Sequence, residues 1–145
     1  SWGDNTLLLA DDDRHVRAPN ATYRAGRMLN TLWADSAGGS NTLLGTKVSA
    51  DGSGVSAYAL RRTDGRIALL IINRDPSTTW TATVSGVGSG AHKLDAWRFS
   101  SAEYQWHAND AKGYAKPNTP PRKSSFAAAS PIELPPYSIV VLREH

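Results

Sequence analysis

From residue 42 to its end, the sequence alternates short runs of β-branched and aromatic residues with turn signals, which predicts an all-β fold over most of the chain. The clearest run is Ile67–Asn73, whose continuous apolar character predicts a central strand covered on both faces. It follows Asp64-Gly65, a pair that suits a tight hairpin turn because glycine accepts positive φ. The run and its turn predict an antiparallel sheet at the centre of the fold.

We expect about seven or eight strands, spaced as in a β-sandwich. Residues 93–99 and 104–107 are expected to pair as a hairpin, because they are close in sequence and joined by Ser100-Ser101-Ala102. Residues 109–125 contain three prolines and are predicted to form a long loop. The complete set of predicted strands is 43–50, 55–62, 67–73, 79–84, 93–99, 103–107, a short one at 125–128, and 137–142.

Two prolines, Pro135 and Pro136, stand directly before the most β-prone run of the chain, Tyr137–Leu142. Neither proline can donate to a ladder, and each biases the preceding residue toward an extended conformation. We therefore expect Ile132–Leu134 to belong to a crossing segment, after which Tyr137–Leu142 enters a sheet that earlier strands have built.

Residues 18–33 form the one convincing helix, because their apolar positions recur at helical spacing. Pro19 suits the first turn, and either Asn20 or Thr22 could supply the N-cap. Gly38-Gly39-Ser40 then breaks the chain. The predicted fold class is mainly β: an antiparallel β-sandwich of about seven or eight strands, with one N-terminal helix packed against it or beside it.

The composition argues against several classes of site and partner. Without cysteine the chain can form no disulfide and no thiolate metal site. Its sixteen basic residues are scattered among thirteen acidic ones, which argues against a nucleic-acid partner. The longest apolar run, residues 67–72, has the length of a strand and argues against a membrane partner. The opening residues Ser1-Trp2-Gly3-Asp4 lack a signal-peptide pattern, and we expect an excised or processed piece.

No metal site and no cofactor are predicted. The acidic run Asp11–Asp13 lacks the spaced Asp-x-Asp-x-Asp-Gly pattern of a calcium loop. A solvated acidic turn is favoured there, with calcium kept as the alternative. The four histidines show none of the spacings that are typical of a metal site.

No catalytic residue is predicted either. Glycoside hydrolysis usually needs two carboxylates at a fixed separation, and the chain has only three glutamates, Glu103, Glu133 and Glu144. We expect all three to be solvated surface residues, because charged side chains are mostly exposed. The nucleophile motif Gly-x-Ser-x-Gly is also missing from the sequence.

Aromatic residues are the more informative candidates. Tyr104 and Trp106 lie two residues apart and would share one face of a strand, and hairpin pairing would bring Trp97 beside them as a flat strip. Sugar rings stack on exposed tryptophan and tyrosine. The alternative is that these rings belong to the core, as we expect for Trp80. The predicted carbohydrate-binding residues are Trp106, Tyr104, Trp97 and Tyr114.

Two parts of the sequence resemble known enzymes. "SWGDNTLLLADDDRHVRAPNATYRAGRMLNTLW" is similar to the final strand, loop and helix of a clan A glycoside hydrolase (β/α)₈ barrel. "VSAYALRRTDGRIALLIINRDP" and the terminal "LPPYSIVVL" resemble the C-terminal β-sandwich of those enzymes, which include arabinofuranosidases and xylosidases. The resemblance divides the chain into a strand–loop–helix segment at 1–40 and a β-sandwich domain at 41–145.

In that clan, the two catalytic glutamates lie at the ends of the fourth and seventh barrel strands, and both positions would precede Ser1. The resemblance therefore implies a non-catalytic accessory or carbohydrate-binding module of a bacterial polysaccharide-degrading enzyme, secreted or periplasmic. Its implied partners are a plant cell-wall-type β-glycan and, as a second one, a catalytic barrel of the same parent enzyme. The alternatives are a purely structural domain that braces a barrel, and a hydrolase fragment that is active only with its missing part.

Overall fold

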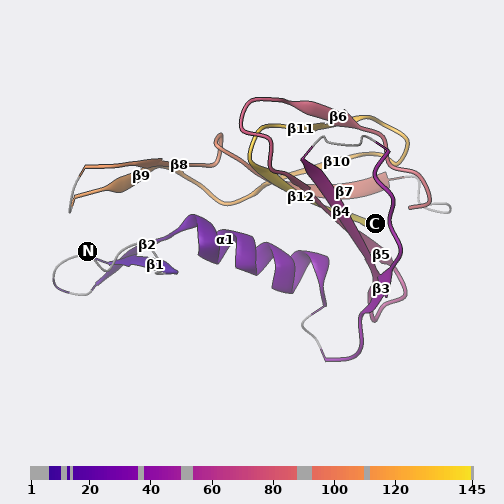
Figure 1. Cartoon of the computed structure of the whole chain (residues 1–145). Coiled ribbons are helices and arrows are strands. Elements are labelled where there is room, and N and C mark those ends of the chain that lie inside the picture. Colours follow the sequence, from indigo (N-terminus) through magenta and orange to yellow (C-terminus); the bar gives the residue numbers. More distant parts are fainter. Residues whose placement is uncertain are drawn as a thin grey trace.

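The computed structural model of the chain describes residues 7–10, 13, 15–35, 38–49, 54–87, 93–109 and 112–144. These residues are mainly β, with one helical segment near the N-terminus, as the sequence predicts (Figure 1). Twelve strands occur in this part of the chain, more than the seven or eight expected, because several are only three or four residues long. They form one large antiparallel sheet and three two-stranded sheets.

The large sheet has six strands in the order β10-β7-β12-β5-β4-β3. At its centre, β12 (Ser138–Glu144) pairs with β5 (Ile67–Asn73) on one side and β7 (Lys93–Phe99) on the other. The prediction that the last apolar run enters a sheet formed by earlier strands is therefore confirmed. The outer strands are β4 (Val55–Arg61), β3 (Thr42–Leu44) and β10 (Arg122–Ala127).

A two-stranded sheet of β6 (Trp80–Ala82) and β11 (Ile132–Leu134) lies over one face of the large sheet (Figure 1). The chain then crosses from β11 to β12 at the two prolines, as predicted. Asn73 fixes this crossing, because its Nδ2 lies 3.0 Å from the Thr78 carbonyl, 3.0 Å from that of Leu134 and 2.9 Å from that of Pro135. The asparagine is buried, so these bonds also satisfy its amide.

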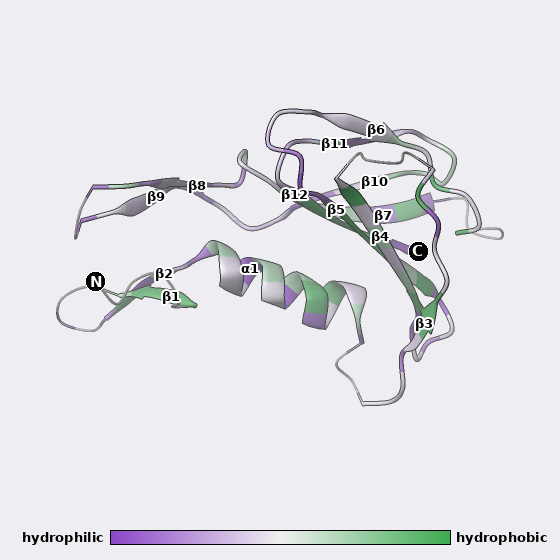
Figure 2. Cartoon of the chain, viewed as in Figure 1, coloured by the Kyte–Doolittle hydropathy of each residue, from purple (hydrophilic) through white to green (hydrophobic). Residues whose placement is uncertain are grey.

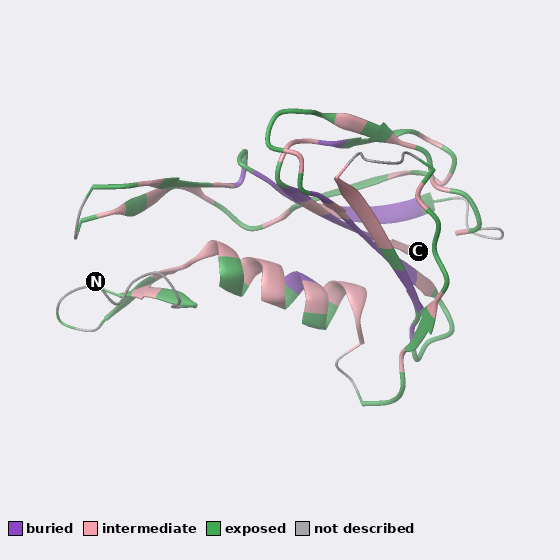
Figure 3. Ribbon diagram, in the orientation of Figure 1, coloured by how far each residue is buried: buried purple, intermediate pink, exposed green. Residues whose placement is uncertain are grey.

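Side chains of the large sheet divide between two hydrophobic cores because successive residues of a strand point to opposite faces. The first core lies under β6 and β11 and includes Leu69, Leu134 and Val140. The second core lies under the helix and includes Leu70 and Val141. Buried residues and apolar residues both concentrate in the central strands (Figures 2 and 3). The predicted burial of β5 on both faces is confirmed.

The helical segment begins as α1 (Ala21–Arg27) and continues as a π-helix, η1 (Met28–Trp33). Asn20 is the N-cap, since its side-chain oxygen accepts the backbone N–H of Tyr23 at 3.0 Å. This decides between the two capping candidates of the sequence. Met28 is 1% exposed and packs into the second core, so the helix lies against the sheet and not beside it.

The C-terminal end of η1 is held by Arg62, whose side chain is only 6% exposed. Its Nη1 donates to the carbonyl oxygens of Leu32, Trp33 and Ala34 at 3.0, 3.1 and 3.1 Å. Carbonyls at a helix end lack intrahelical donors, and a cation there also interacts favourably with the helix dipole. Asp35 lies 3.6 Å from Nη2 and balances the charge. Arg62 therefore joins the helix to the end of β4.

The predicted hairpin of residues 93–99 and 104–107 is wrong. β7 pairs with β10 and β12 through six residue pairs each, which leaves no free edge for β8 (Tyr104–His107). β8 instead pairs with β9 (Tyr114–Asn118) outside the large sheet. Residues 109–125, predicted to be a loop, therefore contain β9 and much of β10. Of the strand predicted at 43–50, only residues 43 and 44 form a strand, as part of β3.

Replacing Arg62 with alanine should lower the free energy of unfolding by about 2–4 kcal/mol, since three half-buried carbonyls lose a charged donor. Urea denaturation measures the change. Arg61→Ala is the matched control, because Arg61 is exposed and its side chain donates to the Gly65 carbonyl at 3.2 Å. Equal losses in the two variants would contradict the role of Arg62.

Candidate functional site

The hairpin of β8 and β9 carries three of the predicted binding residues, and two of them, Trp106 and Tyr114, are 49% and 50% exposed. Tyr114 pairs with His107 across the hairpin, and their rings stack at 5.1 Å with planes 17° apart. His107 and Tyr114 thus share one face, whereas Trp106 points to the other. The Trp106 ring lies over Gly113, where a Cβ would overlap it. The two exposed rings therefore do not form one flat platform.

The other two predicted binding residues, Tyr104 at the start of β8 and Trp97 on β7, lie away from these exposed rings. Tyr104 is half-buried against Phe99, with ring centroids 6.2 Å apart, and belongs to the second core. Trp97 is half-buried on β7, with Lys123 Nζ 5.0 Å and Arg143 Cζ 5.6 Å from its ring centroid. Burial lowers the pKa of Arg143, and the charge of Arg62 lowers it further. The structure therefore divides the expected aromatic strip among separate places.

The hairpin is attached to the helix by Arg24. Its Nη2 and Nε donate to Asn118 Oδ1 at 2.7 and 2.9 Å, and Nη2 also reaches the Asn118 carbonyl at 3.1 Å. Asn118 in turn donates to the Pro19 carbonyl at 3.0 Å. Burial lowers the pKa of Arg24 from its usual value. These bonds join the start of the helix to β9. The β8–β9 hairpin extends to the same side of the large sheet as a second hairpin, formed by residues 8–10 and 16–19 (Figure 1).

The second hairpin pairs β1 (Leu8–Ala10) with β2 (Val16–Pro19) and exposes aliphatic side chains. Its backbone is tied to the helix start, because Asn20 N donates to the Leu7 carbonyl at 3.1 Å. We call the exposed residues of this region the N-terminal apolar surface. They are Leu7 (54% exposed), Leu8 (39%), Val16 (61%) and Tyr23 (38%). The signal of Leu7 and Leu8 in the sequence is the apolar run at 7–10, which does not reveal that these side chains are exposed.

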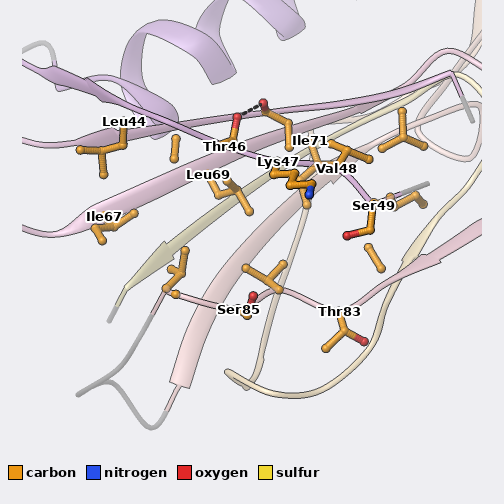
Figure 4. Close-up of a pocket in the computed structure, with 18 of the residues that line it drawn as sticks. Leu44, Thr46, Lys47, Val48, Ser49, Ile67, Leu69, Ile71, Thr83 and Ser85 are labelled. Atoms are coloured by element: carbon orange, nitrogen blue, oxygen red, sulfur yellow. Dashed lines mark hydrogen bonds between the residues drawn. The ribbon is translucent and has the colours of Figure 1, made fainter. Parts of the chain in front are cut away.

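Two grooves flank the small sheet. The apolar groove, of about 520 Å³, lies over β4 and β5 beside β6, and is lined by aliphatic residues such as Val48 and Leu69. Thr46 and Lys47 lie along one of its sides, and Thr83 and Ser85 lie along the other (Figure 4).

The basic groove, of about 370 Å³, lies over β7 and β10 beside β11. Its polar lining residues are Arg98, Arg122, Ser124 and Glu133. Sequence reasoning did not identify it, because its arginines are separated by a long stretch of chain.

The glutamates have structural environments. Glu103 is 5% exposed, so its predicted surface position is wrong. Its Oε2 accepts the backbone N–H and the hydroxyl of Ser100 at 2.9 and 2.8 Å. The Ser-x-x-Glu spacing in the sequence is the signal from which this turn could have been predicted. Glu144 accepts the Ile67 N–H at 2.8 Å, and Glu133 is exposed on β11.

Within the described ranges, no cluster of three His, Asp or Glu residues could hold a metal ion. Asp11 and Asp12 of the acidic run, together with His92 and His145, lie outside the described residues, whereas Asp13 is exposed. No helix in the described part of the chain is long and apolar enough to cross a membrane.

Residues 52–142 match the sequence model of the D-apionate lactonase C-terminal immunoglobulin-like domain, and they make up most of the chain. The chain belongs to this family. The immunoglobulin-like description agrees with the antiparallel sheets of the structure. Among curated proteins, none matches the sequence.

Solved structures of glycoside hydrolases share the fold. The catalytic domain of the GH30 xylanase C from Talaromyces cellulolyticus has a TM-score of 0.63 at 19% identity, over 96% of this chain. CelM2, a bifunctional glucanase-xylanase from a metagenome library, has a TM-score of 0.57 at 19% identity, over 88%. The GH family 44 endoglucanase from Clostridium thermocellum has a TM-score of 0.56 at 17% identity, over 83% of this chain. This chain spans only 27%, 23% and 22% of those three chains.

Removing the Arg24 side chain should loosen the β8–β9 hairpin, because Asn118 then loses its charged donor. We expect Arg24→Ala to lower stability by about 1–3 kcal/mol and to speed amide hydrogen exchange in β9. Hydrogen exchange followed by NMR measures the change residue by residue. The control is Arg27→Ala, an exposed arginine of the same helix. Unchanged exchange in β9 would show that Arg24 does not anchor the hairpin.

Proposed function

We propose that the chain is a non-catalytic accessory domain that docks on the catalytic part of its parent enzyme through the N-terminal apolar surface. Membership of a family of C-terminal domains supports an accessory role. So do the environments of Glu103 and Glu144, whose carboxylates bind backbone N–H groups instead of facing each other across a cleft. Two carboxylates across a substrate are what glycoside hydrolysis usually requires.

The observation that carries this proposal is the exposure of Leu7, Leu8 and Val16 on one short hairpin. Single exposed aliphatic residues are ordinary, but a group of them on one structural element is typical of an interaction surface. Burying such side chains gains about 1.5–3 kcal/mol each. The bond from Asn20 N to the Leu7 carbonyl joins this hairpin to the helix start. Asn118, which accepts from Arg24, donates to the Pro19 carbonyl of the same hairpin, so the surface is also joined to β9.

The docking surface can be tested with Leu8→Asp and Val16→Asp. Each variant should raise the Kd for the separately produced catalytic part of the parent enzyme by about tenfold or more, because a charge replaces buried apolar area. Sedimentation or calorimetry measures the association. The melting temperature should stay nearly unchanged, since both residues are exposed in the chain itself.

Leu43→Asp is the matched control, because Leu43 is a 72% exposed leucine on β3, in another part of the fold. It should leave the association unchanged. The proposal fails if the two parts do not associate, or if Leu43→Asp weakens association as much as Leu8→Asp does.

Binding of a plant-type β-glycan through Trp106 is a second candidate function. The half-exposed indole lies on the rim of the β8–β9 hairpin, with its ring supported by Gly113. An exposed aromatic ring with a polar edge suits the C–H face of a sugar. Because Tyr114 faces the opposite way, this candidate rests on a single ring and not on a strip.

Trp106→Ala should lower affinity for xylan or mixed-linkage glucan by about tenfold, if a stacked ring contributes about 1–3 kcal/mol as it does for nucleic-acid bases. Affinity electrophoresis measures the loss. Tyr137→Ala provides the control, since Tyr137 is a 67% exposed aromatic outside the hairpin. If Trp106→Ala binds glycan as well as the unmodified chain does, or if it melts far lower, Trp106 is not a binding platform.

A further inference from the structure

The basic groove places two arginines directly opposite each other. Arg98 of β7 and Arg122 of β10 are partners in the antiparallel register, so both side chains leave the same face of the sheet. Opposed residues of such a pair have Cβ atoms about 4.5–5.5 Å apart, and like charges at this distance are destabilising. Neither arginine forms an ion pair with a carboxylate among the described residues. No ion pair within this part of the chain therefore offsets the repulsion, which solvent screens in part because Arg122 is exposed.

Arg98 also has a donor without a partner. Its Nε is buried and makes no hydrogen bond. A buried donor left unpaired carries a desolvation cost, and native structures normally satisfy such groups. The guanidinium thus lacks an acceptor at a place where one would relieve both the orphaned donor and the repulsion from Arg122.

The opposite face of the same two strands shows the usual arrangement. There Lys123 of β10 pairs with Asp95 of β7 through Nζ and Oδ2 at 2.9 Å, and Ser125 donates to the same carboxylate. The chain therefore pairs its cation with a carboxylate on one face, whereas on the other face Glu133, the carboxylate that lines the basic groove, forms no ion pair with either arginine among the described residues. In the basic groove, a bound anion would supply the missing acceptor.

The lining of the groove indicates which acceptor fits. Ala96, Ile132 and Val140 form an apolar floor beside the arginines, suited to the C–H face of a small ring. The hydroxyl of Ser124 and the carboxylate of Glu133 can bond ligand hydroxyl groups. Because Glu133 lies in the same groove, a singly charged carboxylate is favoured over a doubly charged phosphate.

We propose that the basic groove binds a small hydroxylated carboxylate, a sugar acid, whose carboxylate accepts from the guanidinium groups of Arg98 and Arg122. An arginine fork matches the two oxygens of a carboxylate. The volume of about 370 Å³ is within the range of small-molecule sites. The site is separate from the N-terminal apolar surface and does not depend on the proposed docking role.

The proposal is tested by titrating the full chain with D-galacturonate and following the Arg98 Nε–H resonance by NMR. We expect a saturable shift of this resonance, and a weaker apparent affinity at higher salt. D-galactose, which lacks the carboxylate, should leave the resonance in place. Inorganic phosphate is the third arm and should bind more weakly than galacturonate.

Calorimetry with variants completes the test. Arg98→Gln should raise the Kd for galacturonate by about tenfold or more, and Arg98→Lys should not restore it, because lysine keeps the charge but loses the fork. Arg66→Gln, which removes an exposed arginine at the β4–β5 turn, is the charge-matched control and should bind normally. Without ligand, Arg98→Gln should melt at or above the temperature of the unmodified chain, since an orphaned donor is removed.

Three results would overturn the proposal: no saturable shift with galacturonate, equal binding of galactose, or tighter binding of phosphate. Equal loss of binding in Arg98→Gln and Arg66→Gln would also overturn it, because the effect would then be one of net charge. A large fall in melting temperature for Arg98→Gln would show that Arg98 is a structural residue with a partner of its own.

Discussion

The placement of β12 between β5 and β7 is the constraint on which the rest of the structure depends. Val140 and Leu142 point into the core under the small sheet, and Val141 points into the core under the helix, each at most 1% exposed. Both covering layers therefore pack against the same strand. Because β12 is the last strand in the sequence, neither core is complete until contacts between distant parts of the chain have formed.

The two layers over the large sheet cover it unequally, and this mismatch produces the surfaces that could bind a partner. Neighbouring strands lie about 4.8 Å apart, so a two-stranded sheet cannot cover six strands. The uncovered strands on either side of β6 and β11 become the apolar and basic grooves. On the other face, the helix covers the centre of the sheet, and the hairpins attached to its start project beyond it (Figure 1). Incomplete coverage thus places both grooves at the edges of the first core, whose residues Leu69 and Val140 line them, and places the hairpins beyond the second core.

Local signals in the sequence predicted the elements, and non-local pairing decided their arrangement. Ile67–Asn73 and Lys93–Phe99 have the predicted bounds, because each is a β-prone run with a clear turn at one end. The β8–β9 hairpin was missed, since its existence depends on β10 and β12 occupying both edges of β7. For the same reason, the sequence alone could not show that Trp97 and Trp106 lie in different sheets. The opposition of Arg98 and Arg122 depends on a register that no local pattern encodes.

Two arginines on opposite faces of the large sheet show how the same side chain can serve stability or binding. Arg62 donates to three carbonyls at the end of the helix. Its Nε makes no hydrogen bond, but the Asp64 carboxylate lies 3.8 Å from it. Arg98 also has a buried Nε without a hydrogen bond, but its neighbour across the ladder is another arginine. A buried cation is tolerated where acceptors and opposite charges surround it. Arg62 meets that condition within the chain, whereas Arg98 is half-buried and has no ion-pair partner among the described residues, and this difference is the basis for the anion site proposed in the basic groove.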